Sequence, residues 1–374
     1  MGSLHQTFVS VLSHLSVQSV LTDISHHACA GVHSVTLRLI SQSKGRHATA
    51  GTSRQRMYEI KHAASKGLGV FATRCIPRGT RIMAEKPMLA VKSERDVYSA
   101  FRALDEGDRK RFMQLSTSPI KRSNVLGWAE ATFQASRQAL SGILNVTQGD
   151  GKAMNRMPDL RSITEYPTVL NVFRNNNFDI GDGTQVMFKD ICRLNHACVP
   201  KAQGNFNTNL GHFTVHAIQS IQPEEEITVS YLAEHGALRD NRQSQLQRQY
   251  GFPCGCAACD FTSAGGKAGE QARQNLQSKL HAFAEEASQQ VRPDPAAELA
   301  IMEEMIQTYE SQGIAGREVA SMCLAAAELA VQVMRKDVAL KLAQKGLRLD
   351  EDAVGGDSPM LEESRARVKA MAIV

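Results

Sequence analysis

The chain has 374 residues, of which 42% are hydrophobic and 22% charged, so it is long enough for two domains and a sizeable core. No apolar run reaches the roughly 18 residues that a membrane-spanning helix needs, so we expect a soluble protein without a membrane partner. The net charge of +5 permits an acidic partner, but no dense basic tract interleaved with aromatic residues predicts direct nucleic-acid binding.

Residues 1–56 differ in composition from the rest of the chain. Asp23 is their only acidic residue, Ser and His are frequent, and the end is basic. This composition loosely resembles a mitochondrial transit peptide. A disordered extension explains this composition equally well. The regular apolar patterns begin at Met57–Ile60, and Met57 could itself be a start of the chain. We predict that residues 1–56 form a separate N-terminal extension.

Residues 57–95 alternate short apolar runs with turns, which predicts strands. Within Lys66–Ala72 (KGLGVFA), Gly67 and Gly69 would let the backbone approach a ligand closely, because no Cβ blocks it. A purely structural turn is the alternative for this pair.

Residues 96–168 change to helical spacing, over Val97–Leu115 and again over Val125–Leu144. We interpret them as a helical insertion that divides two strand-rich segments. The second such segment, residues 169–232, begins near three adjacent asparagines at 175–177, which are typical of a turn. Gly211–Ile218 then alternates as a strand, and Ile221–Tyr231 predicts a turn and a further strand.

Three thiols lie close together in the next segment, residues 233–260. A tetrahedral zinc site requires four N or S ligands, and the C-x-C-x2-C run offers three. The candidate for the fourth is Cys198, which would bring the later loop onto the adjacent Asn-His pair. A closed four-thiolate site would be structural. The predicted ligands are Cys198, Cys254, Cys256 and Cys259, and the remaining cysteines, Cys29, Cys75, Cys192 and Cys323, are interpreted as small buried hydrophobes in a reducing compartment.

Residues 261–374 predict a helical C-terminal lobe. It follows a Gly-rich break at Thr262–Lys267, and Leu276, Leu280 and Phe283 share the face of its first helix. No clean 34-residue repeat is found. A turn at Gly355–Gly356 should interrupt the lobe near its end.

Four motifs in order resemble those of SET-domain proteins: Lys66–Ala72, Arg193–Pro200 (RLNHACVP), Glu225–Tyr231 (EEITVSY) and Cys254–Cys259. The match is most similar to the fungal and SMYD-like branch that has a helical C-terminal region, here without a MYND finger. The resemblance implies an α+β fold, with a mostly β core, a knot-like crossing and a post-SET zinc loop. It also implies S-adenosylmethionine (AdoMet) as methyl donor and a protein lysine as acceptor.

The resemblance assigns donor contacts to several residues. A basic residue would meet the AdoMet carboxylate, glycine-rich backbone and asparagine side chains would hold its amino-acid and adenosyl parts, and an aromatic ring would stack on adenine. The alternatives are a solvated lysine, an asparagine turn, and a buried Asn-His pair satisfied by backbone groups. The residues concerned are Lys66, Gly67, Leu68, Gly69, Asn176, Asn195, His196 and Phe252.

Tyr231 is the candidate catalytic residue, because the family's corresponding tyrosine lines the channel in which lysine meets the methyl group. Methyl transfer needs an unprotonated amine aligned with the methyl carbon, and an apolar channel lowers the pKa of a lysine. A phenol oxygen can orient that amine without acting as a base. An ordinary aromatic residue at a strand end is the alternative.

Two positions depart from the family pattern. Ala197 stands where Ser is usual, which removes a hydrogen bond or two worth about 1 kcal/mol each. Lys201 replaces the usual Asn, and its ammonium would repel a sulfonium unless it points elsewhere. Both put donor affinity or activity in doubt.

The predicted function is AdoMet-dependent protein-lysine N-methyl transfer onto a histone or non-histone acceptor by a monomer. One alternative is a SET-like binding or scaffold protein with weak catalysis, motivated by Ala197 and Lys201. Another is an AdoMet-dependent enzyme acting on a small molecule. We expect an intracellular location, nuclear or cytoplasmic, with mitochondrial targeting by residues 1–56 as the alternative.

Overall fold

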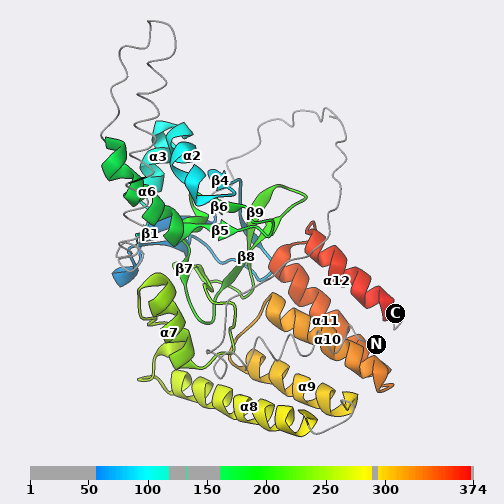
Figure 1. The fold of residues 1–374 in the computed structure, drawn as a ribbon. Coiled ribbons are helices and arrows are strands. Elements are labelled where there is room, and N and C mark those ends of the chain that lie inside the picture. Colours follow the sequence, from blue (N-terminus) through cyan, green and yellow to red (C-terminus); the bar gives the residue numbers. More distant parts are fainter. Residues whose placement is uncertain (1–55, 118–132, 134–160, 289–293, 372–374) are drawn as a thin grey trace, which may run out of the picture. The chain divides into compact units, whose positions relative to one another are not determined.

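The computed structural model describes residues 56–117, 133, 161–288 and 294–371 (Figure 1). The chain divides into two units, Met1–Arg56 and Met57–Val374. Almost all of the first unit lies outside the described residues, so its role as a targeting segment or a disordered extension stays a prediction. The account below concerns the second unit.

The second unit begins with an antiparallel hairpin. Strand β1 (Tyr58–His62) pairs with β2 (Leu68–Ala72), and the short 3-10 helix η1 (Ala64–Lys66) connects them. Gly67 follows η1 with φ +79°, a backbone conformation that residues with a Cβ rarely adopt. The glycine-rich motif therefore forms the turn that starts β2.

Two antiparallel three-stranded sheets follow. In the first, β9 (His212–Ala217) lies between β3 (Arg81–Glu85) and β8 (Ala202–Asn207). In the second, β6 (Gln185–Met187) lies between β4 (Leu89–Val91) and β5 (Phe178–Asp179). Each sheet thus joins strands from before and after the predicted insertion.

The smallest strand pair brings two of the sequence motifs together. Strand β7 (Asn195–His196) pairs in parallel with β10 (Thr228–Val229). The segment before β10 also contacts β2, because Ile227 N donates to Val70 O at 2.8 Å and Phe71 bridges Glu226. The acidic segment is therefore held between the glycine-rich strand and the Asn-His strand.

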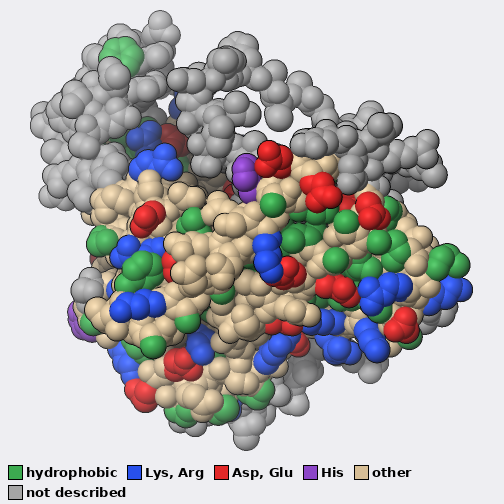
Figure 2. All heavy atoms as spheres, turned by 90° about the horizontal axis from the view of Figure 1, so that it is seen from below, with side chains coloured by type: hydrophobic (Ala, Val, Ile, Leu, Met, Phe, Trp, Pro, Cys, Tyr) green, Lys and Arg blue, Asp and Glu red, His purple; other side chains and the backbone are tan. Residues whose placement is uncertain are grey.

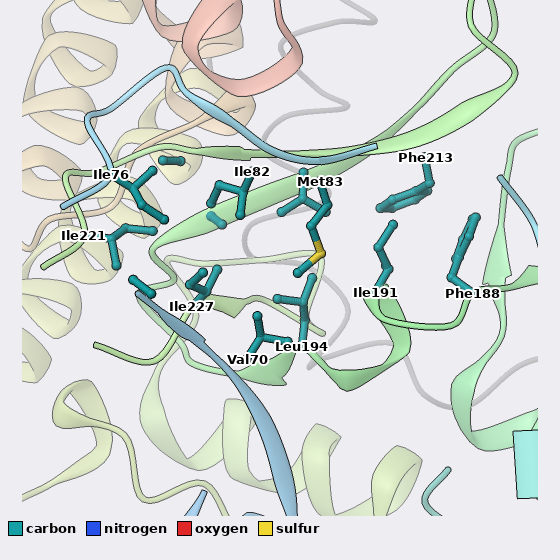
Figure 3. Packing of buried hydrophobic residues seen from close by; sticks show 14 of the residues in the cluster. Val70, Ile76, Ile82, Met83, Phe188, Ile191, Leu194, Phe213, Ile221 and Ile227 are labelled. Atoms are coloured by element: carbon teal, nitrogen blue, oxygen red, sulfur yellow. The ribbon is translucent and has the colours of Figure 1, made fainter. Parts of the chain in front are cut away.

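The main hydrophobic core packs between these strands and the loops that join them (Figure 3). Burying each large aliphatic or aromatic side chain contributes about 1.5–3 kcal/mol. Leu194, next to Asn195, and Val70, next to Gly69, are both buried in this cluster. The core therefore fixes the backbone of the motif residues. Its labelled members are Val70, Ile76, Ile82, Met83, Phe188, Ile191, Leu194, Phe213, Ile221 and Ile227.

Helices of the predicted insertion pack on a second core. They are α2 (Val97–Ala103), α3 (Glu106–Met113) and α6 (Arg161–Asn176). Most of the second predicted helix, residues 125–144, lies outside the described residues, although Phe133 is helical and exposed. Helix α6 crosses the expected boundary at 168–169 without a break. The alternative of an asparagine turn does not hold for Asn175 and Asn176, because both belong to the last turn of α6.

The cysteine-rich segment lies between two helices. Helix α7 (Arg239–Tyr250) ends at Gly251, and the 3-10 helix η4 (Ala257–Cys259) leads to α8 (Ala264–Ser288). The expected glycine-rich break is wrong, because α8 begins at Ala264, directly after Ser263, whose hydroxyl accepts a hydrogen bond from Gly266 N at 3.0 Å.

The C-terminal lobe is helical as predicted. After α8 it comprises α9 (Pro295–Ser311), α10 (Arg317–Gln332), α11 (Lys336–Val354) and α12 (Pro359–Ala370). Gly355, with φ +84°, separates the last two helices where the glycine turn was expected. Figure 1 shows α11 next to β8 and β9, and Asn205 of β8 donates to Ala353 O of α11 at 3.1 Å.

Helical residues outnumber strand residues among those described, so the fold is a mixture of helix and sheet, and only the strand-built core is mostly β. The knot-like crossing stays a prediction. None of the described helices has the length and apolarity to cross a bilayer. On the face drawn in Figure 2, basic and acidic side chains are intermingled.

Candidate functional site

Two predicted donor-binding residues, Asn195 and Lys66, meet at one carboxylate. Asn195 Nδ2 donates to Glu226 Oε1 at 2.8 Å and to Leu68 O at 3.2 Å. Lys66 Nζ lies 2.7 Å from the other oxygen, Glu226 Oε2. The sequence interpretation missed Glu226, because it read the acidic segment only as a turn before a strand. Its signal was its place in the Glu225–Tyr231 motif.

Gly69 is needed for this close packing. A Cβ at this position would lie 2.8 Å from both Asn195 Nδ2 and Glu226 Oε1. A methyl group there would push the amide and carboxylate apart. By contrast, a Cβ at Gly67 would meet nothing within 4 Å, so open space lies beside the turn. The two glycines are therefore needed for different reasons. Gly69 allows the close packing of Asn195 and Glu226, and Gly67 allows a backbone with positive φ.

His196 is buried and neutral. Its Nδ1 accepts a hydrogen bond from Tyr231 N at 3.0 Å, and its Nε2 lies 3.4 Å from Cys198 Sγ. Burial lowers the pKa of the imidazole to about 4. The ring thus ties the backbone of Tyr231 to the Asn-His strand and reaches the cysteine cluster on its other side.

Tyr231 lies among aromatic rings, with its hydroxyl fixed. The hydroxyl donates to Leu194 O at 2.6 Å, and burial raises the pKa of the phenol well above its ordinary value. The ring centroid of Tyr250 is 4.9 Å away and that of Phe252 is 6.4 Å away. Tyr250 was missed from sequence because it ends a polar helix. The phenol stays protonated, so its oxygen keeps lone pairs that can accept from an amine.

The four predicted cysteines come together as expected. Their sulfur atoms all lie within 4.8 Å of one another. Cys198 Sγ is 3.9 Å from Cys254 Sγ and 3.5 Å from Cys259 Sγ. A tetrahedral zinc ion with Zn–S bonds of about 2.3 Å needs sulfur atoms about 3.8 Å apart. The donor set therefore fits a closed structural zinc site, and Cys198, Cys254, Cys256 and Cys259 are the residues that could hold the metal.

Asn176 is not joined to the cluster at Asn195 by any contact that the structure describes. Its Nδ2 donates to Ser116 O at 2.8 Å and to Val172 O at 2.7 Å, and its Oδ1 accepts from the Ser116 hydroxyl at 3.2 Å. The two bonds with Ser116 join the end of α6 to the segment after α3, and the bond with Val172 lies within α6. A role in donor binding stays a prediction for this residue.

The two departures from the family pattern have mild structural consequences. Lys201 Nζ lies 3.0 Å from Glu225 Oε1, so its charge is paired. Ala197 N donates to Val229 O at 3.0 Å, a backbone contact that does not depend on the side chain. The pairing answers the concern about Lys201, because its ammonium faces a carboxylate.

The other cysteines divide into different environments. Cys323 is buried, as predicted, and Cys192 is half-buried. The prediction is wrong for Cys75, which is exposed because it lies in the turn before Ile76. Cys29 lies outside the described residues.

A pocket of about 260 Å³ opens beside β10. Its lining comes from β8, from both neighbours of Tyr231 and from the loop between α9 and α10. At its edge His235 contacts Glu318 of α10. The pocket therefore lies between the segment that follows β10 and the helical lobe. Lining residues include Gln203, Gly204, Ser230, Leu232, His235 and Ala315.

Comparison with known proteins identifies the class. Residues 67–232 match the SET domain family model. Histone-lysine N-methyltransferase set5 of Schizosaccharomyces pombe is 28% identical over 203 residues, covering 54% of this chain and 50% of that protein. The human protein-lysine N-trimethyltransferase SMYD5 is 39% identical over 80 residues, covering 21% of this chain and 19% of that protein. Residues 67–232 are therefore a SET domain, which includes the first three motifs apart from Lys66 and ends before the cysteine run.

The chain spans half of the length of the S. pombe relative and about a fifth of the human one. Among solved structures, the SET domain of LSMT bound to lysine and AdoHcy matches with a TM-score of 0.37 and 10% identity, covering 86% of this chain and 88% of that one.

Proposed function

We propose that this protein transfers a methyl group from AdoMet to the side-chain nitrogen of a lysine in a protein acceptor. The observation that carries the proposal is the placement of Tyr231. Its protonated phenol is fixed to the carbonyl of Leu194, next to the Asn195-His196 strand that the SET resemblance assigns to the donor. The SET domain and the names of the relatives support the same activity.

The residues of this chain would act by positioning. Asn195 and Lys66 present an amide and an ammonium to the donor's amino-acid part, and Glu226 holds both groups in place. When bound, the donor supplies a methyl carbon activated by a sulfonium. Asn195 and Lys66 would hold this donor, which would supply its activated methyl group to the neutral lysine nitrogen.

Tyr231 would orient the attacking amine. Its hydroxyl proton is engaged with Leu194 O, so the oxygen can accept a hydrogen bond from a neutral amine. The surrounding aromatic rings exclude water and favour the uncharged form of a lysine. No proton needs to move to the phenol, which fits its raised pKa.

We also propose that the four cysteines bind one structural zinc ion. A closed thiolate set has no open position for substrate, so the metal would hold the Cys254–Cys259 loop against the Asn-His strand. Phe252, which precedes this loop, lies 6.3 Å from the ring centroid of His196. In this proposal the ring of Phe252 would stack on the adenine of AdoMet.

The test is transfer of labelled methyl groups from AdoMet in a whole-cell extract. The wild type should label a protein band. Tyr231→Phe should lose most of the labelling, because the hydroxyl that orients the amine is removed. Calorimetry should show that this variant still binds AdoMet, because nothing else in the side chain changes. The matched control is Tyr309→Phe, which removes a buried hydroxyl in α9, outside the site.

Three results would contradict the proposal. A wild type without AdoMet binding favours the scaffold alternative. Donor binding without a labelled protein favours a small-molecule acceptor. Equal labelling by Tyr231→Phe and the wild type removes the assigned role of the phenol.

A further inference from the structure

Buried charges lie directly beside the four cysteines. The side chain of Arg242 in α7 is 0% exposed, and those of Glu270 and Arg273 in α8 are 8% and 2% exposed. Arginine is rarely buried this completely unless its charge is balanced. The surroundings of Arg242 should therefore contain matching negative charge.

The contacts of Arg242 lead to the cysteine cluster. Its Nη2 donates to Ala258 O at 3.1 Å and lies 3.7 Å from Cys259 Sγ. On the other side, its Nη1 donates to Ala237 O and lies 3.6 Å from Glu270 Oε2. The guanidinium thus bridges the end of η4 and the carboxylate of α8.

Glu270 does not balance the charges by itself. Arg273 Nη1 lies 3.9 Å from the same Glu270 Oε2, so two guanidinium groups share one carboxylate. Within this group of three side chains one positive charge is in excess. Arg242 Nε, Arg273 Nε and Arg273 Nη2 are also buried without a hydrogen-bond partner among the described residues. Leaving such a buried cation uncompensated is strongly destabilising.

Four neutral thiols would not offset that excess, but a metal centre would. Four thiolates and one Zn²⁺ carry a net charge of −2. We propose that Arg242, backed by Arg273, supplies the positive charge that stabilises a zinc-tetrathiolate centre formed by Cys198, Cys254, Cys256 and Cys259. This inference rests on the zinc site proposed above and assigns Arg242 as a positioning residue for it.

The experiment measures zinc affinity by competition with a chromophoric chelator, using the full-length protein. Arg242→Met keeps the length of the side chain but removes its charge, and it should weaken zinc binding about 10–100-fold. Arg242→Lys keeps the charge and should recover part of the loss. The matched control is Arg248→Met on the same helix, where the side chain is exposed, and its zinc affinity should equal that of the wild type.

A second variant separates charge balance from simple packing. Glu270→Gln removes the carboxylate that competes with the thiolates for Arg242. If Arg242 acts through its charge, this change should strengthen zinc binding, and in the Arg242→Met background it should recover part of the lost affinity. If Arg242 only connects α7 to α8, Glu270→Gln should weaken zinc binding and give no recovery. That second pattern would overturn the inference.

Cobalt substitution checks the ligand set. The Co²⁺ forms of the wild type and of Arg242→Met should both show the absorption of a tetrahedral thiolate site, with only the affinity changed. If the wild type binds neither Zn²⁺ nor Co²⁺, the proposed metal site itself fails. If the wild type binds and Arg242→Met binds equally well, only the role of Arg242 fails.

Discussion

Gly266 lies so close to Asp260 that a Cβ on the glycine would be 2.0 Å from the Asp260 carbonyl oxygen. The start of α8 is thereby packed against the end of the cysteine loop. The same added atom would lie 3.1 Å from Ala257 O, so η4 could not move aside easily. The position of α8, and of the lobe that follows it, depends on this contact.

Gly266→Ala should therefore destabilise the protein, although Ala favours helices more than Gly does. We expect a loss of about 1–3 kcal/mol, the range for overpacking a close contact. Chemical denaturation of zinc-loaded protein measures it. Gly265→Ala is the control, because a Cβ there would meet nothing within 4 Å. If Gly266→Ala is as stable as Gly265→Ala, the close packing of α8 on the loop is wrong.

Glu226 should matter for donor binding although it would not touch the acceptor. Glu226→Ala leaves Asn195 and Lys66 without the carboxylate that orients them. A hydrogen bond to a charged group contributes about 1.5–3 kcal/mol, so calorimetry should show AdoMet affinity reduced at least about tenfold. Glu59→Ala, which removes an exposed carboxylate in β1, should bind like the wild type. Unchanged affinity in Glu226→Ala would show that this carboxylate does not prepare the site.

Glu224 adopts an unfavourable backbone conformation. It has φ +64°, in the left-handed region, which costs about 1–2 kcal/mol for a residue with a Cβ. Glu224→Gly should raise the free energy of unfolding by roughly 0.5 kcal/mol, because the greater flexibility of unfolded glycine offsets part of the gain. Glu224→Ala keeps the Cβ and should show no such gain. Urea denaturation distinguishes the two, and equal stability of both variants would argue against strain at this turn.

His216 should make stability depend on pH. It is buried in β9, its Nε2 accepts from Arg81 Nε at 3.1 Å, and Asp357 pairs with the same arginine. Burial, followed by the charge of Arg81, lowers the pKa of this imidazole to about 4 from 6.5. The unfolded state therefore binds a proton first as pH falls, and stability is lost between pH 6.5 and about 4.

The measurement compares thermal midpoints over that pH range for the wild type and His216→Gln. The variant lacks the titrating group, so its midpoint should fall less steeply with acidification, whatever its absolute stability. Parallel curves for the two proteins would contradict the buried neutral state of His216.

Sequence reasoning found the residues whose chemistry is visible in their spacing. Three cysteines in a short run predicted a fourth zinc ligand elsewhere in the chain. In the structure, Cys198 Sγ lies 3.9 Å from Cys254 Sγ, as expected. Sequence reasoning missed Glu226, Tyr250 and Arg242, because their roles come from contacts with residues distant in the chain. A polar helix gives no sign that one of its arginines is buried.

Local patterns also misled where tertiary packing decides the outcome. The glycines at 265 and 266 predicted a break, but Gly266 is required by the closeness of α8 to Asp260. Asparagines at 175 and 176 suited a turn as the alternative to donor binding, but Ser116 and the carbonyl of Val172 hold Asn176 in the last turn of a helix. In both cases the residue type suited two structures, and a partner far along the chain selected one.

The most direct test of the central claim is the chemical identity of the labelled product. After transfer from methyl-labelled AdoMet by the zinc-loaded protein, the labelled band should be hydrolysed to amino acids and analysed by mass spectrometry. Recovery of the label in N-methylated lysine, lost with Tyr231→Phe and kept with Tyr309→Phe, is the predicted result. Label confined to other amino acids or to small molecules, or lysine labelling that persists in Tyr231→Phe, would contradict the proposed chemistry.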